Sequence, residues 1–208
     1  VSGQVQVGIV TNSAPLPYPD RLVSALLSSC ENIRSIILNL NRSAGNTVLS
    51  GTFETIYGSD YIEDTLCGLT FRLSLRSFYQ INHDQAESLY DKAVEYAGLT
   101  GRETVLDLYC GTGTITLCLA KRAGKAIGAE IVPQAIEDAV ENANLNGIKN
   151  ASFFCADASE IASKLASDGV RPDVITVDPP RKGLSHGVIE SIVKMAPGRV
   201  VYISCDPG

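Results

Sequence analysis

The stretch VLDLYCGTGTITL, residues Val105–Leu117, decides the fold class of this chain. Its first residues suit a buried strand, Gly111 and Gly113 follow in a turn, and the residues after Gly113 suit a helix. Glycines let a ligand approach the backbone closely, and the start of a helix offers free amide groups. The stretch therefore predicts a nucleotide-binding loop at the carboxyl edge of a parallel sheet.

Helices and strands alternate from residue 77 onward, which is typical of a doubly wound, Rossmann-like α/β sheet. The final strand brings Ser204 and Cys205 to the carboxyl edge, and the last strands of the sheet are expected beyond the end of this chain. We expect strands at 104–108, 126–129, 151–155, 174–177 and 199–203, and helices at 84–97, 114–122, 133–146, 159–167 and 187–195.

Residues 1–76 have a different pattern and predict a small α+β domain, which precedes the α/β domain of residues 77–208. Alternating apolar residues and glycine turns indicate several short strands, and one segment has helical spacing. We expect the helix at 20–30 and the strands at 4–11, 35–41, 46–51, 53–68 and 69–75.

The composition predicts a globular protein that is not a strong nucleic-acid binder by itself. Of the 208 residues 45% are hydrophobic, and the net charge of −6 gives few basic groups for phosphate contacts. No apolar run approaches the roughly 18 residues that span a bilayer, so we expect a cytoplasmic location. The six cysteines include no CxxC pair, so neither metal nor disulfide is expected. All except Cys110 and Cys205 should be buried as small apolar residues.

Acidic residues near the loop suit S-adenosyl-L-methionine as its ligand. Glu130 ends the second strand, where its carboxylate can accept hydrogen bonds from both ribose hydroxyls. Together with Asp107 it suits a cofactor that carries positive charge. A nicotinamide dinucleotide is a poorer match, because Thr116 occupies the place of a third glycine. The alternative is an ordinary turn between a strand and a helix.

The segment DPPRKG, residues 178–183, predicts a rigid loop after the fourth strand of the α/β domain. Asp178 ends the strand, and the two prolines after it stiffen a wall that suits a planar base. Arg181 offers a planar cation for carbonyl or phosphate contacts, which argues against methylation of an exocyclic amine. A helix cap or a buried ion-pair partner is the alternative role for Asp178.

Cys205 is the candidate nucleophile. A thiolate that adds to C6 of a pyrimidine makes C5 nucleophilic, so that C5 can attack an electrophilic methyl group. A general base must then remove the C5 proton, and we expect that base beyond Gly208. The alternative for Cys205 is a core cysteine at a strand end. For Cys110, the rival thiol, we expect a steric role beside the glycines.

The chain resembles the S-adenosylmethionine-dependent RNA 5-methyluridine methyltransferases over its whole length. The motifs that carry the resemblance are SFYQIN (77–82), DLYCGTGTITL (107–117), AEI (129–131), DPPRKG (178–183) and YISCDP (202–207). The resemblance implies methylation of C5 of a uridine in RNA, through a covalent adduct of Cys205 at C6. It implies that Phe78 lies near the target base, where stacking suits a flipped-out uridine. The residues that it implies around the cofactor are Gln80, Tyr109, Thr114, Glu130, Asp157 and Asp178.

RNA is the implied partner, with ribosomal RNA favoured slightly over transfer RNA and with no membrane and no metal in this segment. Family members usually carry an N-terminal oligonucleotide-binding barrel, and some hold an iron–sulfur cluster; the sequence contains neither motif. A segment without these parts and without the general base is expected to bind the cofactor but to turn over poorly. Two other functions stay open: an RNA cytosine-C5 methyltransferase, and a non-catalytic module that binds RNA or helps it fold.

Overall fold

The computed structural model describes residues 2–13, 15–43, 48–80 and 82–204. The chain forms two compact units: Val1–Thr65 with Arg72–Arg76, and Leu66–Phe71 with Ser77–Gly208. The sequence placed residues 66–71 in the first domain, whereas they pack with the second unit. The functional division into domains 1–76 and 77–208 stays a prediction.

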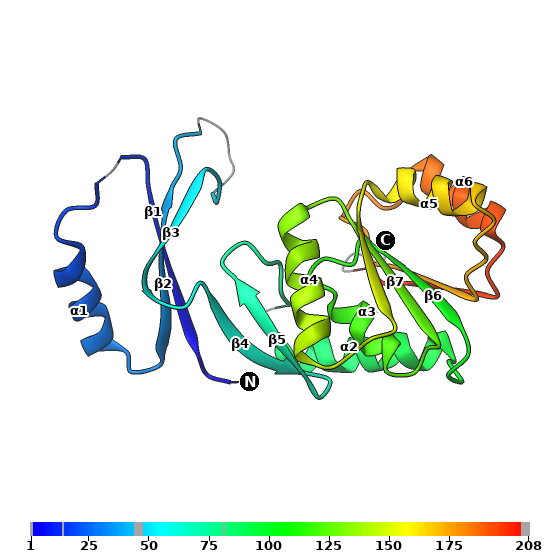
Figure 1. Ribbon diagram of the computed structural model, residues 1–208, viewed down its shortest axis with the longest axis horizontal. Helices are drawn as coiled ribbons and strands as arrows, with labels where there is room; N and C mark the ends of the chain where they lie inside the picture. Colours follow the sequence, from blue (N-terminus) through cyan, green and yellow to red (C-terminus); the bar gives the residue numbers. More distant parts are fainter. Residues whose placement is uncertain (1, 14, 44–47, 81, 205–208) are drawn as a thin grey trace. The chain divides into compact units, whose positions relative to one another are not determined.

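The second unit is built on a parallel sheet, as the sequence predicted (Figure 1). The strand order is β10-β9-β6-β7-β8, and each neighbouring pair is parallel. The order reverses between β6 and β9, and doubly wound sheets bind ligands at the carboxyl ends of the strands beside such a reversal. The strands are β6 (Thr104–Leu108), β7 (Lys125–Glu130), β8 (Ala151–Cys155), β9 (Val174–Val177) and β10 (Arg199–Tyr202).

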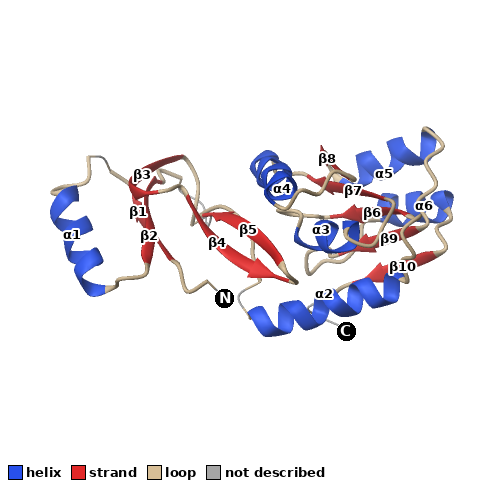
Figure 2. Cartoon of the chain, turned by 60° about the horizontal axis from the view of Figure 1, so that its bottom comes forward, coloured by secondary structure: helices blue, strands red, loops and turns tan. Residues whose placement is uncertain are grey.

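Helices cover both faces of this sheet (Figure 2). On one face lie α2 (His83–Ala97), α3 (Thr114–Ala120) and α4 (Pro133–Leu145), and on the other lie α5 (Ala158–Ser167) and α6 (His186–Met195). Leu106, Ile127 and Ile175 are strand residues in the core that α5 and α6 bury. No helix in the described ranges is both long enough and apolar enough to cross a membrane.

Local signals place the helix ends within two residues of the predicted bounds. The Asn82 side chain accepts a hydrogen bond from the Gln85 N–H at the start of α2, and Gly98 ends this helix in the left-handed conformation. Pro133 begins α4, where a missing N–H costs no helical hydrogen bond. Asp157 caps α5. Pro133 and Asp157 begin helices shortly after β7 and β8, at the carboxyl edge of the sheet.

The first unit contains a three-stranded sheet in the order β1-β2-β3. β1 (Val5–Thr11) and β2 (Ile33–Leu40) are parallel and are joined through α1 (Pro19–Ser29). β3 (Thr52–Gly58) pairs antiparallel with β2. The arrangement agrees with the α+β pattern expected for this part of the sequence.

The strand expected at residues 46–51 is not found in its described part, residues 48–51. The Asn39 side chain donates to the carbonyl oxygens of Ser50 (2.6 Å) and Thr52 (3.0 Å), and Gly51 has a φ of 78°. The prediction was wrong because the segment turns into β3, with its carbonyl groups bonded to a side chain instead of a neighbouring strand.

β4 (Tyr61–Leu66) and β5 (Leu69–Ser74) form a two-stranded hairpin. Its turn consists of Cys67 and Gly68, with φ values of 51° and 68°. Two consecutive positive φ angles are what a type I′ turn requires, and they match the twist of the strands. The turn residues belong to the second unit.

Candidate functional site

The predicted cofactor residues follow the ends of neighbouring strands. Tyr109 follows β6, Glu130 ends β7, Asp157 follows β8 and Asp178 follows β9. Because parallel strands end at the same edge, the topology gathers these residues on the carboxyl edge of the sheet, on both sides of the reversal in strand order. This edge is the candidate functional site.

The loop between β6 and α3 turns sharply through left-handed residues. The φ angles are 69° at Tyr109, 54° at Gly111 and 82° at Gly113. A Cβ atom on Gly113 would lie 3.0 Å from the Cβ of Ala139, whereas a Cβ on Gly111 would meet nothing within 4 Å. Gly113 is therefore required for close packing against α4. Gly111 leaves open space where a ligand can approach the backbone.

Glu130 joins this loop to the end of β7. Its Oε2 accepts a hydrogen bond from the Gly111 N–H at 3.2 Å. Its Oε1 accepts from the N–H groups of Ile131 (2.8 Å) and Val132 (3.0 Å). The carboxylate is half-buried and held in one orientation, and its remaining lone pairs are suited to the hydroxyl groups of a diol.

Asp107 lies inside the sheet, only 1% exposed, and does not form part of the open side of the site. Its two carboxyl oxygens accept hydrogen bonds from the hydroxyls of Thr116 (2.5 Å) and Thr176 (2.8 Å). Burial raises the pKa of Asp107 to about 7, against the opposing effect of the two hydroxyl donors. The residue therefore ties β6 to α3 and β9. The sequence instead suggested that it would complement a positively charged cofactor.

Tyr90 is a residue of this site that the sequence reasoning missed. The Thr114 hydroxyl donates to the Tyr90 hydroxyl at 3.4 Å, and both residues are buried. Burial raises the pKa of Tyr90 to about 12, and the nearby negative charge of Asp178 contributes to this rise. Ala86, Tyr90 and Ala93 lie on the buried side of α2, and this helical spacing was the signal that could have revealed the tyrosine.

Asp178 itself is half-buried, and desolvation raises the pKa of its carboxyl group. Because its charge affects both Tyr90 and Asp107, Asp178 lies on the side of the site where β6 and β9 meet. The sequence analysis predicted that Asp178 would lie at the end of this strand. The loop after it turns back at once, with the Gly183 N–H donating to the Pro180 carbonyl at 2.8 Å.

Tyr109 and Asp157 lie near each other across the ends of β6 and β8. Burial raises the pKa of Tyr109, and the charges of Asp157 and Tyr202 add to this effect. Asp157 also has a structural task, because its Oδ1 accepts a hydrogen bond from the Ser159 N–H at 2.8 Å and so caps α5. A second oxygen remains for other partners.

For the other predicted site residues the structure gives the exposure or, for Cys205, nothing, because it lies outside the described ranges. Phe78 is 77% exposed, so its ring is not packed in a hydrophobic core, and Gln80 is half-buried. Arg181 is exposed. Cys205 lies outside the described residues. The strand before it, β10, runs parallel to β9, and the Ile203 N–H donates to the Val177 carbonyl at 2.9 Å.

The cysteines differ in their exposure from what the sequence predicted. Cys110 is buried, a Cβ on Gly128 would lie 2.9 Å from its sulfur, and burial raises its pKa well above the usual value. These observations support the steric role expected for Cys110. The prediction that the others are buried was wrong for Cys155, which is exposed, and for Cys30 and Cys67, which are half-buried. Within the described part of the chain, no group of three or more potential ligands could hold a metal ion.

Several known proteins are similar to this chain in sequence and in fold. The chain is 43% identical over 99% of its length to an uncharacterized RNA methyltransferase of Halalkalibacterium halodurans, and 44% identical over 100% to one of Listeria innocua. It superposes on the tRNA (uracil-54, C5)-methyltransferase of Pyrococcus abyssi in complex with S-adenosyl-L-homocysteine. That match has a TM-score of 0.80 and 31% identity, and it covers 98% of this chain and 47% of the archaeal protein.

The chain spans about half the length of these relatives, 45% of the first and 46% of the second. The sequence profile of one enzyme family, the tRNA (uracil-5-)-methyltransferases, matches residues 40–208, which include the glycine loop and all the strand ends described above. The chain therefore belongs to the tRNA (uracil-5-)-methyltransferase family.

Proposed function

We propose that the protein transfers a methyl group from S-adenosyl-L-methionine to C5 of a uridine in RNA. The observation that carries the proposal is the pairing of Glu130 with the Gly111 N–H at the carboxyl edge of the sheet. This pairing places an oriented carboxylate beside an open glycine loop. The archaeal relative that holds S-adenosyl-L-homocysteine supports the choice of cofactor.

The residues of the edge fit such a cofactor. Glu130 would accept hydrogen bonds from the ribose hydroxyls. Gly111 would let the cofactor lie against the backbone of the loop, and Gly113 would let the same loop pack closely against α4. The positive charge of the cofactor would be attracted by the negative charge of Asp178. We assign the remaining wall of the cofactor pocket to Gln80, Tyr109, Thr114 and Asp157.

When bound, the cofactor supplies an electrophilic methyl group. The Cys205 sulfur would add to C6 of the uracil, and the electron pair of the C5–C6 double bond would make C5 nucleophilic. C5 would then accept the methyl group and lose its proton to a general base, and the cysteine would be eliminated as the double bond re-forms. Asp178 and the two prolines after it would form a rigid loop against which the planar base can lie.

RNA contacts are assigned to two exposed residues. The ring of Phe78 is free to stack on a base, and the guanidinium of Arg181 can bind a phosphate or a carbonyl oxygen. Features of the sequence favour ribosomal RNA slightly, whereas the family description and the archaeal relative name transfer RNA. Both RNA classes therefore belong in the assay.

Calorimetric titration with S-adenosyl-L-homocysteine tests the cofactor site. We expect Glu130→Ala and Asp178→Ala each to weaken binding by about 10- to 100-fold, since hydrogen bonds to charged groups contribute about 1.5–3 kcal/mol. Glu141→Ala is the matched control, because Glu141 is an exposed carboxylate on α4, and it should leave the affinity unchanged. If the folded Glu130→Ala and Asp178→Ala variants bound S-adenosyl-L-homocysteine as tightly as wild type, the carboxyl edge would not be the cofactor site.

Covalent trapping tests the chemistry. RNA that contains 5-fluorouridine should form an adduct with the protein in the presence of the cofactor, because fluorine at C5 cannot leave as a proton does. Cys205→Ala should abolish the adduct, and Cys155→Ala, at the exposed end of β8, should not. A model hairpin with cytidine in place of uridine distinguishes the cytosine-C5 alternative. An adduct that survives Cys205→Ala contradicts the mechanism.

A further inference from the structure

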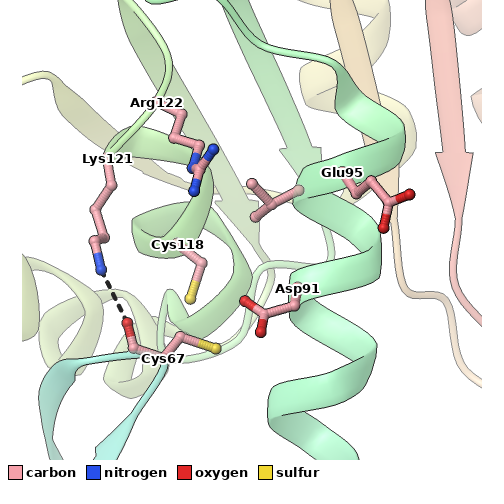
Figure 3. Close-up of a pocket in the computed structure, with 7 residues that line it drawn as sticks. Cys67, Asp91, Glu95, Cys118, Lys121 and Arg122 are labelled. Atoms are coloured by element: carbon pink, nitrogen blue, oxygen red, sulfur yellow. Dashed lines mark hydrogen bonds between the residues drawn. The ribbon is translucent and has the colours of Figure 1, made fainter.

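The α/β unit contains a cleft that is lined by none of the residues of the candidate functional site (Figure 3). Its volume is about 370 Å³. It is formed by the turn of the β4–β5 hairpin, by α2 and by the last part of α3 with the residues after it. The residues that line it are Cys67, Asp91, Val94, Glu95, Cys118, Lys121 and Arg122. None of them belongs to the site proposed for the methyl transfer.

Two thiols from distant parts of the chain meet in this cleft. Cys67 lies in the hairpin turn and Cys118 lies on α3, and Figure 3 shows both sulfur atoms pointing into the space between them. Each of the two thiols is the largest single influence on the pKa of the other, as expected for side chains that lie next to each other. Cys67 is half-buried and accessible from the cleft, whereas Cys118 is 4% exposed. The pair thus consists of one accessible and one shielded thiol.

The backbone of Cys67 is held from two sides. Its N–H donates to Oε1 of Glu87 on α2 at 2.7 Å, and its carbonyl oxygen accepts from Nζ of Lys121 at 2.9 Å. The residue also has a positive φ of 51°, which the type I′ turn imposes. These contacts keep the Cys67 side chain facing α3.

The interaction with Cys118 favours a thiolate at Cys67. This interaction lowers the pKa of Cys67 and raises the pKa of Cys118. Lys121 also lowers the pKa of Cys67, while burial, Asp91 and Glu87 act in the opposite direction. A thiolate is the form of cysteine that attacks disulfides and peroxides.

We propose that Cys67 and Cys118 are a redox-active dithiol, a modification site that closes to an intramolecular disulfide when it meets a low-molecular-weight disulfide. The Cys67 thiolate attacks one sulfur of the reagent, forms a mixed disulfide and releases one thiolate. The Cys118 thiol loses its proton to the solvent and attacks the Cys67 sulfur, which releases the second small thiolate. The protein loses two electrons and two protons, and the reagent is reduced to two thiols.

The disulfide would join the hairpin turn to the helix that begins directly after the glycine loop. The segment between the two cysteines would then be closed into a long covalent loop, which restricts the unfolded chain. We therefore expect the oxidised protein to unfold at a higher temperature than the reduced protein, and a reductant to reverse the shift.

Mass spectrometry after incubation with glutathione disulfide tests the proposal. Remaining thiols are alkylated, and the protein is digested without reductant. We expect a linked pair of peptides that contains Cys67 and Cys118, about two hydrogens lighter than the separate peptides and absent after reduction. Cys155→Ser is the matched control, since Cys155 is an exposed thiol outside the cleft, and it should leave the yield of the linked peptides unchanged.

Cys118→Ser should stop the reaction at its first step, with glutathione attached to Cys67. The proposal is overturned if the wild-type protein gains glutathione on Cys155 without forming the Cys67–Cys118 link. It is also overturned if Cys67 links to another cysteine instead, or if Cys67 in folded Cys118→Ser takes up no glutathione. The measurement on the wild-type protein decides the question even where the variant fails to fold.

Discussion

Asp107 illustrates at the scale of one residue how the glycine loop is held in place. The carboxyl group lies inside the sheet and accepts hydrogen bonds from two threonine hydroxyls, one on α3 and one on β9. Burial raises its pKa from 3.8 to about 7. The folded protein therefore binds a proton at Asp107 in a pH range in which the unfolded chain has already released it.

This shift predicts how stability depends on pH. Between about pH 4 and pH 7 the folded state binds more protons at Asp107 than the unfolded state, so the free energy of unfolding falls as the pH rises. The stabilising effect is complete below the unfolded pKa and is lost as the pH passes the folded pKa. Asp107→Asn is neutral at every pH, so its stability relative to wild type should increase by a few kcal/mol from pH 4 to pH 8.

Urea unfolding at several pH values measures this difference. Asp168→Asn serves as the control, because Asp168 is exposed at the end of α5 and its variant should follow the wild-type curve. Parallel curves for wild type and Asp107→Asn would contradict the buried, proton-binding carboxyl group.

At the scale of elements, the beginning of α5 combines a structural and a proposed binding role in Asp157. This residue caps the helix, whereas Ser185 at the beginning of α6 makes no side-chain capping hydrogen bond. We expect Asp157→Ala to lower the free energy of unfolding by about 0.5–2 kcal/mol, and Ser185→Ala to have little effect. Thermal or urea unfolding of the two variants measures the difference.

Asp157→Asn separates the two roles. Asparagine keeps the oxygen that accepts from the Ser159 N–H, so stability should be close to that of wild type. If the variant nevertheless binds S-adenosyl-L-homocysteine more weakly, the charge of Asp157 acts on the cofactor. Unchanged affinity would leave the residue with its structural role alone.

The elements of the α/β unit could be predicted from the sequence because their signals are local. The buried residues of β6 and the caps at Asn82 and Gly98 are visible in the order of residues. Contacts between residues that only the folded sheet brings together could not be predicted from local patterns. Thr116 was interpreted as the place of a missing glycine, yet its hydroxyl donates a hydrogen bond to Asp107. In the described residues 48–51 of the expected strand, the Ser50 carbonyl accepts a hydrogen bond from the Asn39 side chain, and no strand forms.

At the carboxyl edge and in the cleft of Cys67 and Cys118, too, only the locally encoded features could be predicted from the sequence. Glu130 was predicted as a cofactor residue from its place at a strand end, and in the structure its carboxylate accepts a hydrogen bond from the Gly111 N–H of the glycine loop. Its role in cofactor binding stays a prediction. The contact between Tyr90 and Thr114 and the meeting of Cys67 with Cys118 join residues that are far apart in the sequence. Such pairs depend on how helices pack, which no local pattern of residues specifies.

At the scale of the whole molecule, the net charge of −6 restricts how the chain can bind RNA. Phosphate contacts dominate RNA affinity and make it depend on salt, so an acidic protein must rely on a few local cations. Arg181 is exposed in the loop after β9, beside the proposed site. We expect weak binding with a shallow dependence on salt concentration.

Fluorescence anisotropy with a labelled RNA hairpin at about 50 and 200 mM salt tests this expectation. If Arg181 binds a phosphate, Arg181→Ala should weaken binding and reduce the slope of log K against log salt by about 1. Arg102→Ala is the matched control, because Arg102 is exposed before the start of β6, at the opposite edge of the sheet. Equal losses in both variants would mean that RNA responds to overall charge, and that the carboxyl edge does not provide a specific phosphate contact.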